Sequence, residues 1–271
     1  MGLRINQNVA AQNSYRNLSI TDGQMSKSLE KLSSGFRINR AADDAAGLSI
    51  SEGLRAQVGG LKVAVRNAQD GISVAQTAEG ALNEVHSVLQ RMRDLSVQAA
   101  NDGASDPKAK EAAQAEFAEL SSALDQIGTD TAFGKTKLLD GSFTAKDFQI
   151  GANTGEKVTV TIDQVSAADL GIDSLDLTTG AAAAIDTIDA AIETVSEQRS
   201  TLGAAQNRFE HTINNLNVSV ENLSASESRI RDTDMAQEMV SFTRSQILTQ
   251  AGTSMLGQAN QASQNVLSLL R

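Results

Sequence analysis

The stretch that decides the fold lies at residues 185–230 and reads IDTIDAAIETVSEQRSTLGAAQNRFEHTINNLNVSVENLSASESRI. Seven apolar side chains in it fall on one strict seven-residue register: Ile188, Val195, Leu202, Phe209, Leu216, Leu223 and Ile230. A second register is filled only in part, by Ile185, Ile192, Ile213 and Val220. A sustained seven-residue apolar repeat is typical of a helix packed in a coiled coil. We therefore predict a long helix beginning near Ala181, with a break at residues 231–233.

Outward from this stretch, apolar residues at spacings of three and four predict further helices. The first runs over about 9–32 and a second runs from residue 45 to about 100. A third begins with Asp106 as its N-cap and Pro107 at its first position, and Gly128 is expected to end it. Asp234 with Gln237 resembles a capping box that opens a last helix.

Only the region of about 133–178 shows a strand pattern. Residues 148–150 precede a glycine-rich turn, and apolar residues then alternate with threonine over 158–162, which is typical of a β-hairpin. The sequence therefore predicts a mainly α protein, an elongated antiparallel helical bundle or coiled coil with one small β-hairpin region.

The composition of the 271 residues excludes several functions. There is no cysteine, so disulfides, thiolate metal sites and thiol nucleophiles are ruled out. His86 and His211 stand far apart without a catalytic constellation, so we expect no enzyme activity, no metal and no cofactor. No run approaches the roughly 20 apolar residues that span a bilayer, so no membrane insertion is expected.

The charge is unevenly distributed along the chain. The net charge is −10, yet residues 1–66 carry nine Lys or Arg and five acids, so the remaining residues carry −14. Without interleaved aromatics, a basic arm of this kind does not favour nucleic acid as a partner. Self-association between oppositely charged parts is the favoured interpretation. The N-terminus also lacks the apolar run of a secretory signal peptide.

The first and last helices have narrow apolar faces and are weak alone, so we expect them to order only on assembly. We expect them to form a coiled coil there. The residues expected to form their seams are Leu18, Met25, Leu29, Leu32, Met239, Phe242, Ile247, Leu248, Val266, Leu267 and Leu270.

Both ends of the chain resemble bacterial flagellin. The N-terminal motif is read at 32–39 (LSSGFRIN) and 42–48 (ADDAAGL). The C-terminal motif is read in segments of 228–270, which include SRIRD, QIL, QAGTS, QANQ and QNVLSLL.

This resemblance implies a self-assembling filament subunit of the bacterial flagellum, used for motility and lacking the outer variable domains of longer relatives. It implies an inner-tube domain of 1–44 with 233–271, disordered in the monomer, and a rod domain of 45–232. It further implies secretion through the flagellar type III apparatus to the extracellular flagellum. The implied partners are further copies of the chain, an export chaperone at about 233–271, and hook-associated and cap proteins.

Residues 90–98 resemble the flagellin patch read by the vertebrate flagellin-sensing Toll-like receptor. Arg91, Leu95 and Gln98 match the contact positions, and Glu116 resembles the acidic partner on the neighbouring helix. A contact between subunits of the filament is the alternative, and the favoured native role, for the same residues. A hook–filament junction protein exported by the same apparatus remains the alternative for the whole chain.

Overall fold

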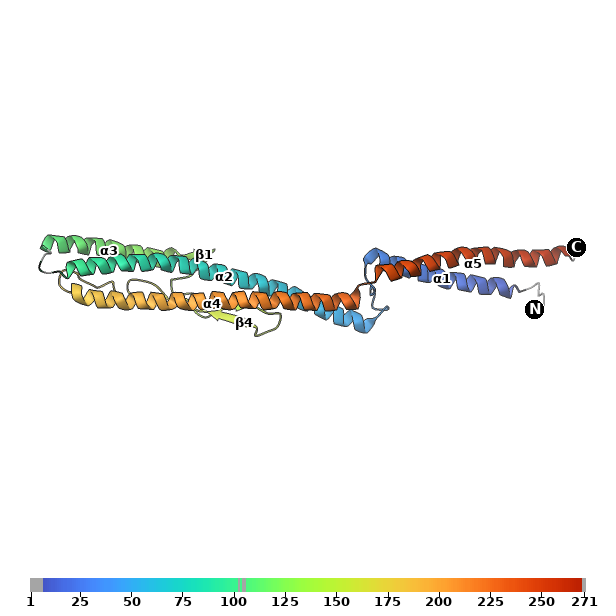
Figure 1. Ribbon diagram of the computed structural model, residues 1–271, viewed down its shortest axis with the longest axis horizontal. Coiled ribbons are helices and arrows are strands. Elements are labelled where there is room, and N and C mark those ends of the chain that lie inside the picture. Colours follow the sequence, from blue (N-terminus) through green and yellow to red (C-terminus); the bar gives the residue numbers. More distant parts are fainter. Residues whose placement is uncertain (1–6, 102, 104–105, 270–271) are drawn as a thin grey trace. The chain divides into compact units, whose positions relative to one another are not determined.

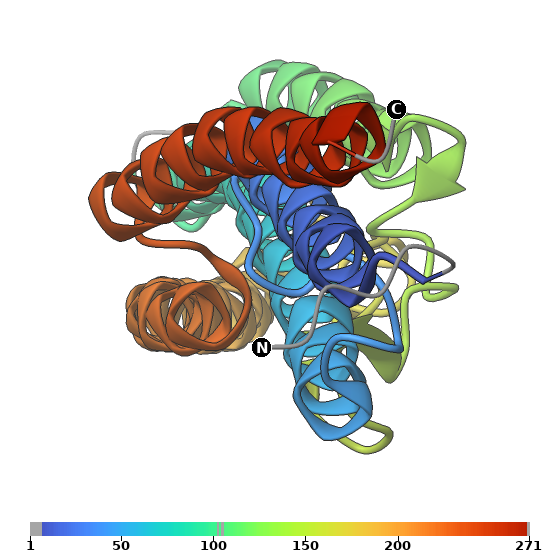
Figure 2. The ribbon, with the colours of Figure 1, turned by 90° about the vertical axis from the view of Figure 1, so that its right-hand side faces the viewer.

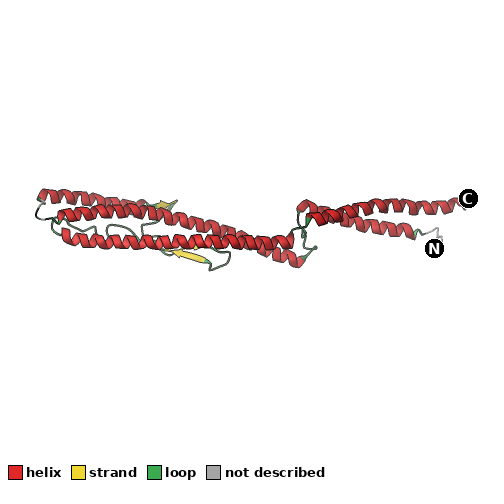
Figure 3. Cartoon of the chain, viewed as in Figure 1, coloured by secondary structure: helices red, strands yellow, loops and turns green. Residues whose placement is uncertain are grey.

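The structure is a computed structural model that describes residues 7–269 except 102, 104 and 105, with side chains described as far as residue 261. Long helices make up most of the chain and the strands are short, so the mainly α class is confirmed (Figures 1 and 3). The elements in order are α1 (Val9–Ser34), α2 (Ala45–Ala99), α3 (Pro107–Asp130), β1 (Ala132–Phe133), β2 (Thr136–Lys137), β3 (Lys146–Gln149), β4 (Lys157–Val160), α4 (Ala181–Arg231) and α5 (Met235–Leu269).

The chain divides into two compact units. The terminal unit comprises Met1–Ala56 and Asn222–Arg271, and the middle unit comprises Gln57–Glu221. The terminal unit therefore contains α1, α5, the start of α2 and the end of α4.

Local chemistry explains where several helices begin and end. The Asn8 side chain accepts a hydrogen bond from the backbone N–H of Ala11 and caps α1, and Gly35 ends α1 at φ +76°. A side chain at that position would strain the backbone, which is why glycine suits it. Asp44 Oδ1 accepts from the N–H of Gly47 at 2.8 Å at the start of α2. Asp234 Oδ1 likewise accepts from the N–H groups of Ala236 and Gln237 at the start of α5.

The third helix corrects two details of the sequence prediction. Asp106 does occupy the N-cap position before Pro107, but its side chain makes no capping hydrogen bond. Gly128 does not end the helix, which continues to Asp130. Instead, a Cβ at this buried position would overlap the carbonyl oxygen of Val165, so the glycine serves the close approach of a returning loop.

The middle unit has a continuous apolar core between α2, α3, α4 and the connecting loops. Its α2 and α4 stretches run antiparallel, since Arg93 of α2 pairs with Asp189 and Glu79 pairs with Gln206. The predicted α4 register faces this core: Ile188, Val195, Leu202 and Phe209 are fully buried and Leu216 is 8% exposed. Phe209 lies against Gly71, where an added Cβ would come within 2.8 Å of the ring.

The predicted β-hairpin is confirmed. β3 pairs antiparallel with β4, with Phe148 opposite Val158, and the turn falls in the glycine-rich stretch before Lys157. Phe148 packs edge-on against Phe209 with ring centroids 5.5 Å apart, which seats the hairpin on α4. A second, two-residue hairpin of β1 and β2 was not predicted.

The segment between β4 and α4 crosses the middle unit without regular structure, yet it supplies much of the core. Its apolar anchors are almost fully buried: Ile162, Val165, Ala167, Ile172 and Leu177. Helix side chains satisfy its backbone, because the Gln114 amide accepts from Leu177 N–H and donates to the Leu175 carbonyl. Asp125 accepts from Ala167 N–H, and Gln198 donates to the Asp163 carbonyl. An irregular segment is stable in a core only when its polar groups are paired in this way.

Candidate assembly surfaces on the terminal helices

The helices α1 and α5 lie side by side in the terminal unit (Figures 1 and 2). On each helix, buried and half-buried positions recur at spacings of three and four, the geometry of a coiled-coil seam. On α1 these positions are Ala11, Ser14, Leu18, Thr21, Met25, Ser28 and Leu32. On α5 they are Glu238, Phe242, Ser245, Thr249, Gly252, Leu256 and Ala259.

This α1–α5 seam is built mainly from small and polar residues. Ser28 and Ser245 are each 6% exposed, and Leu18 seats against Gly252, where an added Cβ would lie 3.3 Å from Leu18 Cδ1. Polar contacts cross it: Thr249 Oγ1 donates to Asp22 Oδ1 at 3.2 Å, and the Asn8 amide donates to the Ala259 carbonyl at 2.9 Å. Such contacts fix the register of the two helices but bury little apolar surface.

Apart from Phe242 and Leu256, the large apolar side chains of α5 that the structure describes lie outside this seam. They are at least 48% exposed and comprise Met235, Met239, Val240, Ile247, Leu248 and Met255. Four of them, with Thr243 and Arg244, line an open groove of about 460 Å³. We call this surface the outer α5 face. A contiguous exposed apolar surface of this kind marks an interaction site rather than ordinary surface composition.

The predicted seam residues thus fall into two groups. Leu18, Met25, Leu32 and Phe242 are half-buried in the α1–α5 seam. Leu29, Met239, Ile247 and Leu248 are exposed, by 56%, 49%, 62% and 50% respectively. Val266, Leu267 and Leu270 lie outside the residues whose side chains the structure describes. A role of all these residues in polymerisation stays a prediction.

Sequence reasoning missed the junction where α1 ends and α5 begins. The two connecting segments form an antiparallel bridge between Phe36 and Asp232, and Thr233 N–H donates to the Gly35 carbonyl at 3.0 Å. Arg231 stacks 4.8 Å from the Phe36 ring centre and donates to Glu52 at 2.7 Å.

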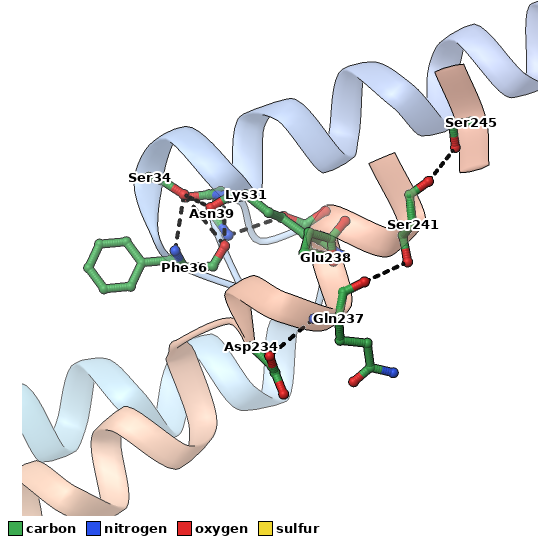
Figure 4. Close-up of polar contacts among 10 residues, drawn as sticks. Lys31, Ser34, Phe36, Asn39, Asp234, Gln237, Glu238, Ser241 and Ser245 are labelled. Atoms are coloured by element: carbon green, nitrogen blue, oxygen red, sulfur yellow. Dashed lines mark hydrogen bonds and ion pairs between the residues drawn. The ribbon is translucent and has the colours of Figure 1, made fainter. Parts of the chain in front are cut away.

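Further polar groups surround this junction (Figure 4). Lys31 faces Glu238 at 3.8 Å, and Ser34 Oγ accepts from the Phe36 N–H at 3.1 Å. The signals in the sequence were Gly35 in the first break and the polar residues of the second break at 231–234.

In the middle unit, the structure joins two of the residues singled out on helices α2 and α3. Arg91 Nη2 lies 2.6 Å from Glu116 Oε1, and both side chains are about half exposed. Gln98 is also exposed, whereas Leu95 is 2% exposed and faces the core. Leu95 therefore offers almost no surface to a partner and belongs to the apolar core of the middle unit.

Other kinds of site find no support among the described residues. No group of three acidic or histidine side chains there is placed to hold a metal ion. No helix in the described part of the chain combines the length and apolarity needed to cross a bilayer.

Family models and known proteins match the chain along most of its length. Residues 5–144 match the bacterial flagellin N-terminal helical region, and residues 185–270 match the bacterial flagellin C-terminal helical region. Flagellin of Halalkalibacterium halodurans is 53% identical, over 98% of this chain and 99% of its own length. Flagellin of Bacillus subtilis is 48% identical, over 99% of this chain and 100% of its own length. The flagellar filament 33 kDa core protein of Treponema phagedenis is 45% identical, over 98% of this chain and 99% of its own length. The chain therefore belongs to the bacterial flagellin family and is a structural subunit of the flagellar filament.

Proposed function

We propose that copies of this chain assemble through their terminal helices, with the outer α5 face buried against α1 and α5 of neighbouring copies. The observation that carries this is the exposure of Met239, Ile247 and Leu248 beside a seam of small and polar residues. A helix pair that buries so little apolar surface is marginal alone. Further copies supply the missing burial, so assembly and ordering of these helices are coupled.

The inner-tube domain in this proposal comprises residues 1–44 with 233–271, and the rod domain comprises 45–232. The chain leaves the cell unfolded through the flagellar type III apparatus and adds to an extracellular filament. On the way, an export chaperone binds about 233–271, where the outer α5 face is a suitable helix-in-groove ligand. Hook-associated and cap proteins are the partners at the filament ends.

Electron microscopy of purified full-length protein, seeded with filament fragments or salted out, tests the assembly. Wild type is expected to form long tubes. The double variant Ile247→Glu/Leu248→Glu is expected to stay soluble, because it places charge on the surface that must be buried. Val218→Glu changes a valine that is 57% exposed in the middle unit and serves as the control. Wild-type protein that stays monomeric under every seeding condition would contradict the proposal, as would tubes formed by the double variant.

A second proposal concerns the surface around the Arg91–Glu116 ion pair. We infer that it forms a subunit contact in the filament, and that a vertebrate flagellin-sensing Toll-like receptor recognises the same residues in the monomer. The support is an exposed, charge-paired surface with Gln98 nearby. Arg91→Ala is expected to impair both filament assembly and receptor signalling. Normal filaments with normal signalling would exclude both roles.

A hook–filament junction protein is the alternative role. The length of the assemblies distinguishes the two roles. A junction protein forms a short ring or zone, whereas a filament subunit elongates without limit. Elongation from seeds to tubes many subunits long favours the filament role.

A further inference from the structure

A polar groove in the terminal unit carries more cationic side chains than its own chain neutralises. It encloses about 320 Å³ beside the junction and is lined by Lys27, Lys31, Arg37, Ile38, Ala42, Asp43 and Asp44. We call it the basic groove. Ile38, which is 1% exposed, gives it an apolar floor.

The two acids of the basic groove are already engaged by backbone N–H groups. Asp43 Oδ2 accepts from Arg40 at 3.0 Å and from Asn39 at 3.2 Å, and Asp44 Oδ1 accepts from Gly47. The hydrogen bond from the Arg40 N–H, and then that from Asn39, lowers the pKa of Asp43. The positive charges of Lys27 and Lys31 lower it by a smaller amount. Both carboxylates therefore cap the local backbone, and neither lies within ion-pair distance of Lys27, Lys31 or Arg37.

The cations of the groove are the less satisfied groups. Lys27 is exposed and forms no ion pair within the described part of the chain. Lys31 approaches Glu238 only to 3.8 Å, and Arg37 donates to the neutral carbonyl of Ile230 at 2.5 Å. The groove is thus suited to a carboxylate supplied from outside.

The charge of the two units indicates where that carboxylate comes from. The terminal unit has 11 Lys or Arg against 9 Asp or Glu, a net charge of +2. The middle unit has 12 against 24, a net charge of −12. In a polymer of one chain, surfaces of opposite charge on different copies attract and fix their register.

One surface of the middle unit concentrates this negative charge. Residues 158–198 contain eight acids and no Lys or Arg. Four of the acids lie on one exposed face of α4, at spacings of three, four and four: Asp186, Asp189, Glu193 and Glu197. We call this face the acidic stripe. Among the described residues, only Asp189 of the stripe is in an ion pair, with Arg93 at 2.6 Å.

We propose that the basic groove of one copy receives the acidic stripe of a second copy during assembly. This inference rests on the proposed self-assembly and names a polar contact that acts beside the outer α5 face. Lys27 is the cation free to bind the incoming carboxylates, and Glu193 and Glu197 are the acids free to enter.

The test measures the concentration of full-length protein left unassembled after seeded growth, at low and at high salt. Lys27→Glu is expected to raise that concentration roughly three- to tenfold at low salt, the effect of one or two exposed ion pairs. The difference from wild type should shrink as salt screens the contact. Lys62→Glu makes the same charge change at an exposed site of the middle unit and is expected to change the concentration much less.

A charge-swapped chain, Lys27→Glu with Glu193→Lys and Glu197→Lys, is expected to recover assembly toward the wild-type level. A control chain combines Lys27→Glu with Glu111→Lys and Glu119→Lys, two acids of α3 outside the acidic stripe. This control chain should not recover assembly. Equal effects of Lys27→Glu and Lys62→Glu would overturn the inference. A swapped chain no better than Lys27→Glu alone would also overturn it, because the groove would then bind another carboxylate. Failure of wild type to elongate at all would instead count against the proposed function.

Discussion

The α4 stretch of the middle unit and the α1–α5 pair of the terminal unit use the same heptad spacing with opposite side chains. In α4, the register positions from Ile188 to Phe209 are large, apolar and fully buried. In the α1–α5 seam, equivalent positions include Ser28, Ser245 and Gly252, and the apolar positions are only half-buried. Most of the large apolar side chains of α5 lie outside the seam. A helix seam of one spacing is therefore either a finished core or part of a larger one, depending on which residues occupy it.

Hydrogen exchange in the monomer gives the largest expected difference between the two seams. Amides of α4 between Ile188 and Phe209 open only with the unfolding of the middle unit. Amides within residues 9–34 and 235–261 open with the helix pair alone. We expect at least about a thousandfold slower exchange in the α4 segment. Comparable protection of both regions before polymerisation would contradict the coupling of helix ordering to assembly.

Core truncation gives the next largest effect. Leu202→Ala leaves a cavity in a fully buried site and is expected to lower the free energy of unfolding by about 2–5 kcal/mol, measured by urea denaturation. Ile247→Ala, at a site that is 62% exposed, should change it by less than about 0.5 kcal/mol in the monomer. A similar loss for both variants would show that the outer α5 face is already buried before assembly.

Two glycines of the middle unit should respond to replacement by alanine in opposite ways. Gly128→Ala drives a methyl group into the Val165 carbonyl and is expected to destabilise the unit by about 1–3 kcal/mol. Gly203→Ala, within α4 and with nothing inside 4 Å of the added carbon, should stabilise it by about 0.5–1 kcal/mol. Thermal unfolding followed by circular dichroism separates the two signs, and a stabilising Gly128→Ala would refute the packing argument.

The smallest expected effect is electrostatic and lies in the β3–β4 hairpin. Lys157 Nζ, at 2.5 Å, and then Thr159 Oγ1, at 2.6 Å, donate to the Asp147 carboxylate and hold its pKa below the ordinary value. A pKa lowered by folding stabilises the folded state above the unfolded pKa of about 3.9. That contribution disappears as the pH falls through the folded pKa.

A carboxyl NMR titration measures this pKa directly. Lys157→Ala should move it back toward the ordinary value, because it removes the largest cause of the shift. Lys146→Ala is the control, because Lys146 precedes Asp147 in β3 but is not part of the Lys157–Asp147 ion pair. An unchanged titration in Lys157→Ala would mean that the ion pair is not formed in solution.

Much of the fold was predictable because it depends on local pattern. The α4 register, Pro107 at the start of α3 and the alternation over 158–162 each determine a local conformation within a few residues. The role of Gly128 was not predictable in this way, since it depends on a loop carbonyl that returns from residue 165. The β1–β2 hairpin was missed because two residues per strand give no alternation to recognise.

The candidate site was predictable only in part for the same reason. The sequence identifies Met239, Ile247 and Leu248 as apolar residues of an assembling helix, but not the face on which they lie. Periodicity predicted apolar positions of the α1–α5 seam, such as Leu18 and Phe242. Polar positions of the seam, such as Ser245 and Thr249, carry no hydrophobic signal and were missed. The basic groove likewise combines side chains from α1 and the following loop, which only a folded junction brings together.

By itself, the amino-acid sequence determined that the protein is a chain of long helices with one β-hairpin, and its terminal motifs indicated the flagellin family. These features follow from spacing and local propensity along a single segment. The folded chain was needed to show which face of α5 meets α1, which cations lack an ion pair and why Gly128 must be small. Each of these depends on distances between side chains of different elements, and the packing of the folded chain sets those distances.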